Sequence, residues 1–212
     1  MPPLLVPLGD CGLLIRFAES LSDAANAAAI GFGRRAIAAG LPGVMEVVPN
    51  LVSVLLRYDP RQVGFDRLAG EVRLLLSAPA EPAAAGANHL VPVRFDGDDL
   101  DEVAQQLGMD PATFVATHNA GPLRVLATGF APGFVYCGLH ADPMRVARRA
   151  AVRPRVPGGT VLFAAGQTAI TSTPIPTGWH VIGHTAFCNF DASARPPTQL
   201  AAGDTVRFET LE

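Results

Sequence analysis

The sequence contains no lysine, because all 16 of its basic residues are arginine. This absence excludes a phosphate-binding P-loop lysine, a Schiff-base lysine and a biotin-carrying lysine on this chain. Cysteine is scarce, and Cys11, Cys137 and Cys188 are widely spaced without a Cys-x-x-Cys pair. They predict neither a disulfide framework nor a zinc knuckle, and they are typical of a reducing compartment.

Long apolar runs are absent as well, although 49% of the 212 residues are hydrophobic. No run approaches the roughly 20 residues needed to span a bilayer. The first ten residues, MPPLLVPLGD, lack the basic start of a signal peptide. The net charge of −3 comes without a basic run, which argues against nucleic acid as the main partner. We expect a cytoplasmic protein that binds neither nucleic acid nor membrane.

The common catalytic signatures GxSxG, HExxH, GxGxxG and the Walker sequence are also absent. The usual hydrolase, zinc peptidase and dinucleotide-binding classes therefore have no support. His180 and His184 are four residues apart, which places both on the same face of an extended strand. A metal site needs a third ligand that the sequence does not offer, so we expect no metal here.

The sequence divides into two segments. Residues 1–80 give the order β-α-β-β-α, with a strand at 13–17 and a helix between an expected N-cap at Ser22 and a stop at Gly40. This order predicts a small ferredoxin-like α+β domain. Residues 81–88 are rich in Ala and Pro without periodicity, and they predict a linker.

Residues 89–212 predict a mainly β domain, so the whole chain falls in the α+β class. A strand opens the segment, and two short helices follow, one at 99–107 and one starting at Asp110–Pro111. From Leu123 onward, short apolar stretches alternate with Gly- and Pro-rich turns, a pattern that favours a barrel or a sandwich.

The loop GFAPGFVYCG at 129–138 contains three large aromatic residues in a stretch that cannot form a regular helix or strand. Aromatic residues in such a loop either fill the core or form a pocket wall. We expect Phe130, Phe134 and Tyr136 to shape one wall of a groove, with at least one of them in the core.

The segment PRVPGGTVLFAAGQTAI at 154–170 has the densest set of polar candidates. Arg155 can clamp a carboxylate or phosphate, and free N–H groups of the turn at 157–159 can cradle an anion. The amide of Gln167 can bind an amide or lactam edge. Alternatively, the glycines only make a hairpin and Arg155 is solvated.

Several other residues have both a structural and a functional interpretation. Trp179 belongs either to the core or to a surface that stacks on a substrate. His118 either stabilises a helix C-terminus or acts as a general base, for which no orienting partner is evident. We expect Cys137 to be an inert, packed thiol. We expect His140 and Asp142 to lie in a surface loop.

The stretches PLGDCGLLIRF, GFAPGFVYCGL, PRVPGGTV, AAGQTAI and GWHVIGHT occur in this order. With them the chain resembles the B-type subunit of bacterial 5-oxoprolinase, a family also called allophanate hydrolase subunit 1 or KipI-like. The family is similar to half of the carboxyltransferase region of urea carboxylase. The resemblance implies an N-terminal α+β domain followed by a cyclophilin-like β-barrel. It also implies a cyclophilin-like partner, the C-type subunit, and a third, lactam-binding subunit.

The implied activity is the ATP-dependent opening of 5-oxoproline to glutamate, with ATP and Mg on the complex and no biotin on this chain. From residue type and motif position, the candidate catalytic residues are Arg155, Gln167 and His118. The implied residues for substrate or nucleotide binding are Phe130, Pro132, Gly133, Phe134, Tyr136, Pro157, Gly158, Gly159, Thr168, Trp179 and His184.

The sequence departs from the family at three places. His184 stands where the family usually has arginine, and Thr171 stands where it usually has an aromatic residue. One glycine of the usual YLGGL is missing at Cys137–Gly138–Leu139. Two alternatives stay open. One is a carboxyltransferase half-subunit of a urea carboxylase or allophanate hydrolase system, working with biotin on another protein. The other is a KipI-like inhibitor of a sensor histidine kinase.

Overall fold

A computed structural model describes residues 2–78 and 86–211. The chain divides into two compact units, Met1–Ala85 and Gly86–Glu212. Of the predicted linker at 81–88, residues 81–85 lie outside the described residues, and Asn88 is the first residue of a strand. In the described part, no helix is long and apolar enough to cross a membrane.

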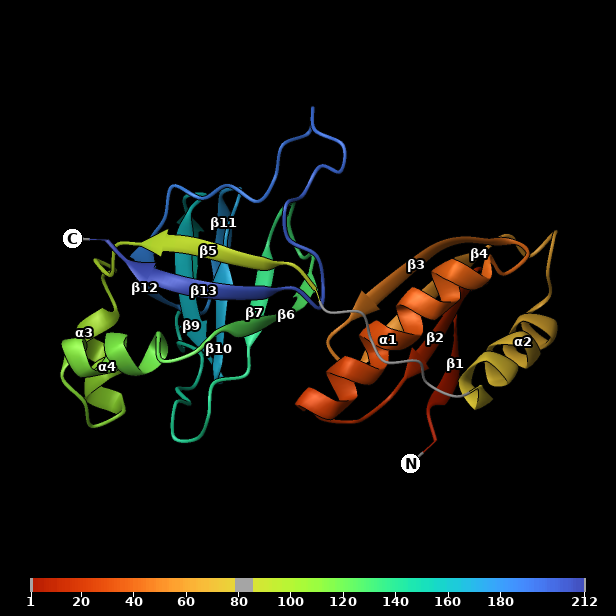
Figure 1. Cartoon of the computed structure of the whole chain (residues 1–212), viewed down its shortest axis with the longest axis horizontal. Coiled ribbons are helices and arrows are strands. Elements are labelled where there is room, and N and C mark those ends of the chain that lie inside the picture. Colours follow the sequence, from red (N-terminus) through yellow and green to blue (C-terminus); the bar gives the residue numbers. More distant parts are fainter. Residues whose placement is uncertain (1, 79–85, 212) are drawn as a thin grey trace. The chain divides into compact units, whose positions relative to one another are not determined.

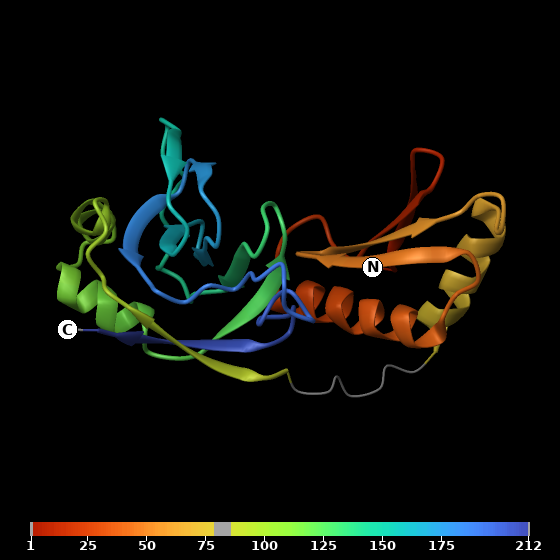
Figure 2. The ribbon, with the colours of Figure 1, turned by 90° about the horizontal axis from the view of Figure 1, so that it is seen from above.

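The first unit is a four-stranded antiparallel sheet with two helices (Figure 1). The strands lie in the order β1-β2-β4-β3. Their bounds are β1 Leu4–Leu8, β2 Gly12–Arg16, β3 Val44–Asn50 and β4 Ser53–Tyr58, and the helices are α1 Asp23–Ala39 and α2 Phe65–Ser77. Figure 2 shows α1 lying along one face of this sheet.

The ends of α1 follow the local sequence signals. The Ser22 side chain accepts a hydrogen bond from the Ala25 N–H, and Gly40 closes the helix in the left-handed conformation with φ 55°. Both helices pack apolar side chains onto the same face of the sheet. The fully buried members of this core are Leu13, Ile15, Ala29, Phe32, Val54, Leu56 and Val72.

The ferredoxin-like assignment of this unit is not confirmed. The structure adds β1 ahead of the first predicted strand, so the order is β-β-α-β-β-α. Pro3 and Pro7 argue against a strand at this position, since proline cannot donate to a ladder. β1 is an edge strand, so the N–H groups on its outer side have no neighbouring strand to bond. Proline, which lacks an N–H, is tolerated at such positions.

The second unit is built on a curled, half-barrel sheet of seven strands in the order β12-β9-β10-β7-β6-β13-β5. The first and last strands approach each other through a bridge between Arg94 and His184. The strands of this sheet are β5 Asn88–Val93, β6 Leu123–Thr128, β7 Val135–Gly138, β9 Thr160–Ala164, β10 Gln167–Ile170, β12 His180–His184 and β13 Thr205–Thr210. The remaining elements are α3 Leu100–Gln106, α4 Pro111–His118 and a ribbon of β8 Arg153–Val156 with β11 Ile175–Thr177.

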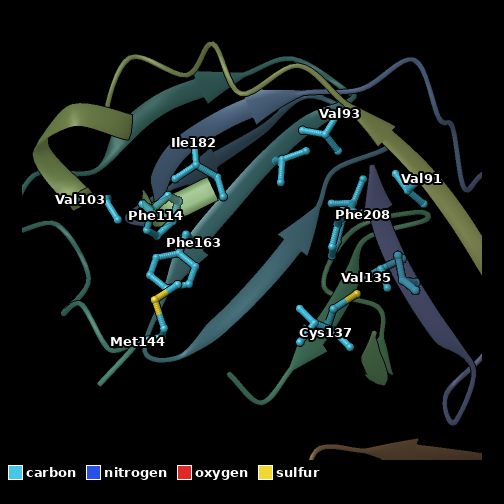
Figure 3. Close-up of a cluster of buried hydrophobic side chains, with 14 of the residues drawn as sticks. Val91, Val93, Val103, Phe114, Val135, Cys137, Met144, Phe163, Ile182 and Phe208 are labelled. Atoms are coloured by element: carbon cyan, nitrogen blue, oxygen red, sulfur yellow. The ribbon is translucent and has the colours of Figure 1, made fainter. Parts of the chain in front are cut away.

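Two hydrophobic cores occupy the two faces of this curled sheet. The inner core gathers alternate residues of most strands together with α3 and α4, and Figure 3 shows Phe114, Phe163, Ile182 and Phe208 in it. The intervening strand residues form a second cluster, whose members are Phe134, Val156, Leu162, Ala164, Ala169, Ile175, Trp179 and Val181. β9 and β10 are therefore buried on both faces. The chain is a mixed α/β protein.

Removing the Phe163 ring tests the inner core. Phe163 is fully buried and meets Phe114 edge-on at 5.4 Å between ring centroids. We expect Phe163→Ala to lower the free energy of unfolding by about 3–5 kcal/mol, because it leaves a cavity. Trp179 is the only tryptophan and lies in the second unit, so its fluorescence during urea unfolding reports on this unit.

The control is Val152→Ala, since Val152 belongs to the same unit and is 65% exposed. This change should stay within about 0.5 kcal/mol of the parent chain. Equal losses in the two variants would contradict the position of Phe163 in the core.

Candidate functional site

Strand β10 places two neighbouring polar residues on opposite faces of the sheet. Ala169 belongs to the outer cluster and Ile170 to the inner core. Because side chains alternate along a strand, Gln167 lies on the outer face and Thr168 on the inner face. The candidate site is the outer face around Gln167.

A row of aromatic rings crosses the outer face. Ring centroids are 5.5 Å apart between Phe130 and Phe134, 4.8 Å between Phe134 and Tyr136, and 6.0 Å between Tyr136 and Trp179. The Arg148 guanidinium lies 5.7 Å from the Trp179 ring centroid, within cation–π distance. Burial raises the pKa of the Tyr136 hydroxyl, and nearby Arg148 opposes this rise.

The rings of this row differ in exposure. Phe134 and Trp179 are buried in the outer cluster, whereas Phe130 is 71% exposed and has a positive φ of 79°. A positive φ is uncommon outside glycine and marks a constrained loop. Gly133 is buried, and a Cβ there would press on Phe190 and Ser172. The loop thus anchors Phe134 and presents Phe130 to solvent, with exposed Pro132 between them.

Gln167 carries an unsatisfied polar atom. The residue is only 8% exposed, and its side-chain Oε1 is buried with no hydrogen-bond partner in residues 2–78 and 86–211. Most buried polar groups in proteins are paired, so an unpaired acceptor calls for an explanation. An acceptor that the chain leaves open is suited to a ligand N–H or O–H donor.

The segment after β7 contacts both sides of the sheet, since Met144 and Val146 belong to the inner core and Arg148 lies beside Trp179 of the outer cluster. The Ala165 N–H donates to Val146 O at 2.7 Å, and the Arg149 N–H donates to Gly178 O at 2.7 Å. His180 Nε2 donates to Ala147 O at 2.9 Å, because a carbonyl can only accept. His180 Nδ1 is buried and has no partner among the described residues. These bonds hold the backbone of residues 146–149 so that Arg148 reaches Trp179.

A buried carboxylate fixes the same segment from the other side. Asp99 Oδ1 accepts from Arg149 Nη1 and from Arg153 Nη2, each at 2.5 Å. Asp99 Oδ2 accepts from the Val181 N–H at 2.8 Å. The sequence pattern predicts only a helix start at Asp99, and it holds no signal for partners 50 and 54 residues away.

The inner face of β10 contains a closed polar chain. The Thr168 hydroxyl lies 2.7 Å from His118 Nε2 and 2.8 Å from His140 Nε2, and His118 Nδ1 lies 2.7 Å from Asn119 Oδ1. Since Asn119 Oδ1 only accepts, His118 carries its proton on Nδ1 and accepts from Thr168 on Nε2. His140 Nε2 then donates to the Thr168 oxygen.

Burial controls the charge of both histidines. It lowers the pKa of His118 to about 4, and burial together with the neighbouring His118 lowers the pKa of His140 to about 3. The assignment of His140 to a surface loop is wrong, because it is 8% exposed, whereas Asp142 is exposed as expected. Cys137 is fully buried, which raises the pKa of its thiol to about 12 and fits inert packing.

His118 is placed away from the candidate site. It ends α4, is 1% exposed and lies on the inner side of the sheet, opposite to Gln167. Its ring contacts Phe95, Phe114 and Phe208. The structure therefore gives His118 a structural role in holding Thr168.

In the turn at 157–159, the Gly159 N–H is not free for an anion. The Gly159 N–H donates to Thr171 O at 2.7 Å, and the Thr171 hydroxyl donates to Pro157 O at 2.8 Å. A Cβ on Gly158 would lie 2.7 Å from Ser172 O, and one on Gly159 would collide with Thr185 O. The glycines are there for close packing, which is the hairpin alternative.

Arg155 and His184 lie apart from the aromatic row. Val156 enters the outer cluster, so the neighbouring Arg155 points the other way along β8 and is exposed. No ion pair of Arg155 exists in the described part of the chain. His184 Nδ1 lies 2.7 Å from Asp96 Oδ1. Residues 2–78 and 86–211 contain no group of three or more side chains that could hold a metal.

Known proteins resemble this chain over most of its length. The model of the carboxyltransferase domain, subdomains C and D, matches residues 3–200. The B-type subunit of 5-oxoprolinase from Bacillus subtilis (strain 168) is 30% identical over 215 residues, covering 95% of this chain and 90% of that protein. The corresponding 5-oxoprolinase subunit of Escherichia coli O157:H7 is 33% identical over 174 residues, covering 79% and 78%.

Solved structures agree with this. The crystal structure of TTHA0988 matches with a TM-score of 0.84 at 37% identity over 95% of this chain, which spans 40% of that longer chain. The K. lactis urea amidolyase matches with a TM-score of 0.79 over 99% of this chain and 15% of its own. Its 14% identity shows a shared fold alone.

Together with the curled sheet, these matches identify the second unit and its loops as part of a carboxyltransferase domain. The chain belongs to the carboxyltransferase domain C and D family, which confirms the resemblance drawn from the motif series.

The buried histidines make stability depend on pH. An unfolded histidine has a pKa near 6.5, above the folded values of about 4 and about 3, so protons bind the unfolded chain first. Their contribution is complete above about pH 6.5 and is lost as the pH falls toward 4. We expect a loss of up to about 1.4 kcal/mol per pH unit for each histidine in this window.

Urea unfolding at several pH values, followed by Trp179 fluorescence, measures this slope. His118→Gln should reduce the slope between pH 6.5 and 4 by about one proton, whatever its effect on absolute stability. A slope identical to that of the parent chain would rule out a neutral buried His118.

Proposed function

We propose that this chain is a subunit of an ATP-dependent 5-oxoprolinase that opens 5-oxoproline to glutamate. It acts with a cyclophilin-like homologue of the C-type subunit and a third, lactam-binding subunit, with ATP and Mg on the complex. The observation that carries the proposal is the unpaired Gln167 Oε1 on an aromatic face, in a chain related to proteins named as B-type subunits of 5-oxoprolinase.

A lactam matches a glutamine amide in hydrogen bonding. It has one N–H donor and one carbonyl acceptor side by side, and Gln167 has one acceptor and one donor group in the same arrangement. Once a side-chain movement exposes it, the buried Gln167 Oε1 takes the ring N–H, and Nε2 donates to the carbonyl. Tyr136 and Trp179 supply apolar surface for the ring methylenes.

Arginine supplies the positive charge that the reaction needs. 5-Oxoproline has a carboxylate, and phosphorylated intermediates add further negative charge. Arg148 is held over Trp179 on the Gln167 face and suits the substrate carboxylate. Arg155 is exposed and has no anionic partner among the described residues, so it is free to hold a phosphate from the partner side.

ATP activates an unstrained amide in this scheme. The lactam carbonyl oxygen takes the terminal phosphoryl group, and ADP leaves. Water adds to the activated carbon, and the C–N bond breaks with the amine as leaving group. A second water then releases inorganic phosphate and leaves glutamate. His118 takes no part as a base, because it is buried on the opposite face of the sheet.

The test is an ATP-dependent assay for glutamate from 5-oxoproline on the co-expressed subunits. We expect activity only with all subunits and none from this chain alone. Gln167→Ala should lower kcat/KM by about 10–100-fold, the value of one or two hydrogen bonds to the reacting group. The matched control is Gln105→Ala, an exposed glutamine on α3 of the same unit, which should leave turnover unchanged.

Thermal unfolding of each variant should be measured in parallel, because Gln167 is buried and its replacement can also lower stability. Full turnover by a folded Gln167→Ala complex would remove Gln167 from the site. A stable wild-type complex without 5-oxoproline turnover would reject this substrate and favour carboxyl transfer or kinase inhibition.

A further inference from the structure

The sheet of the first unit has one covered face and one open face. Residues Leu13 and Ile15 of β2 and Val54 and Leu56 of β4 are fully buried under the two helices. Because side chains alternate along each strand, the residues between them project from the opposite face. In a soluble sheet packed on one side only, this face is expected to be polar.

The open face has one apolar row that crosses all four strands, between rows that also contain polar residues. The register places Val6 opposite Leu14, Leu14 opposite Leu55, and Leu55 opposite Val48, so a continuous aliphatic row crosses the sheet. None of the four side chains is buried. Leu4 and Leu8, 50% and 52% exposed, flank the row on β1. A contiguous apolar surface of this kind marks an interaction site.

The edges of the sheet restrict how a partner can bind. β1 and β3 are the edge strands, and they contain Pro7 and Pro49. Proline removes a backbone donor, and it is one of the devices that prevent another strand from pairing with an edge. A partner is therefore expected to pack on the face rather than to extend the sheet.

The charged residues beside the row indicate which charge a partner surface should carry. Arg57 is paired with Glu46 at 2.9 Å on one side of the row. On the other side, Arg16 is exposed and has no ion pair among the described residues. A carboxylate on the partner can pair with Arg16 while aliphatic side chains cover the row.

The size of the face argues against a second copy as the occupant. Four strands at about 4.8 Å spacing and three side-chain rows at about 6.6 Å give a flat area of roughly 400 Å². A stable two-body interface buries about 800 Å² per partner. A partner that is also held elsewhere in a larger assembly can use so small a face, whereas a dimer through this face alone lacks area.

We propose that the open face, defined by Leu4, Val6, Leu8, Leu14, Leu55 and Val48, docks the cyclophilin-like partner subunit of the complex. The inference rests on the proposed function for the identity of that partner. The partner surface is aliphatic and places an acidic side chain opposite Arg16. The TTHA0988 chain is consistent with this, since this fold forms only 40% of it and further chain is available there to cover the face.

The experiment measures the affinity of the full chain for the purified cyclophilin-like partner by calorimetry. Leu55→Glu lies at the centre of the row, and we expect it to weaken binding at least tenfold, since a charge would be buried unpaired. Arg16→Glu should weaken binding about fivefold, and Arg16→Lys should retain most of it. Leu74→Glu is the matched control, because Leu74 is 69% exposed on α2 of the same unit, and it should bind like the parent chain.

The outcomes separate this inference from the proposed function. Wild-type affinity of a folded Leu55→Glu chain, in a complex that still turns over 5-oxoproline, overturns the docking face and leaves the function intact. Loss of binding in Leu55→Glu, with a wild-type complex that has no turnover, supports the face and rejects the function. No binding by the parent chain overturns both. A dimer of the chain alone that Leu55→Glu abolishes identifies a second copy as the occupant and overturns the inference.

Discussion

The alternation of side chains along β10 is the constraint on which the second unit depends. The strand is four residues long and buried on both faces, so each polar residue in it projects into one of two buried environments. Thr168 finds two histidines inside the curled sheet. Gln167, one residue earlier, lies on the outer face, and its Oε1 is unpaired among the described residues. A shift of one residue in register would exchange the two faces and remove both arrangements.

The sequence predicted what depends on short-range signals. The Ser22 cap and the Gly40 stop bound α1 as expected, and Asp110 caps α4 through the Thr113 N–H. The aromatic loop was also recognised, since Gly and Pro at fixed positions require a shaped turn. Phe130 is exposed and Phe134 is buried because only one side of the loop packs on the sheet. The sequence does not show which side this is, since it depends on the tertiary fold.

Interactions between distant residues were beyond the sequence. Asp99 has the form of a helix cap, but its carboxylate bonds two arginines 50 and 54 residues away. His140 follows a loop motif, and burial by the inner core was not visible in its neighbours. β1 was missed because the penalty for proline in a strand applies to central strands, and the position of a strand in its sheet is a tertiary property.

The Pro-Gly-Gly turn and Gln167 show two different reasons for an unusual residue. One is close backbone packing, and the other is a buried acceptor without a partner in the part of the chain that the structure describes. The glycines of the turn are required because Ser172 and Thr185 backbone oxygens approach them, so the surrounding chain fully explains them. The same holds for Thr171, whose hydroxyl ties the turn to β10. Gln167 Oε1 is different, because nothing in the described chain satisfies it, and burial makes an unpaired acceptor costly. His180 Nδ1 is also buried without a partner among the described residues, so the unpaired atom alone does not single out Gln167. Its position on the same face of the sheet as the aromatic row is the second observation on which the proposed binding role rests.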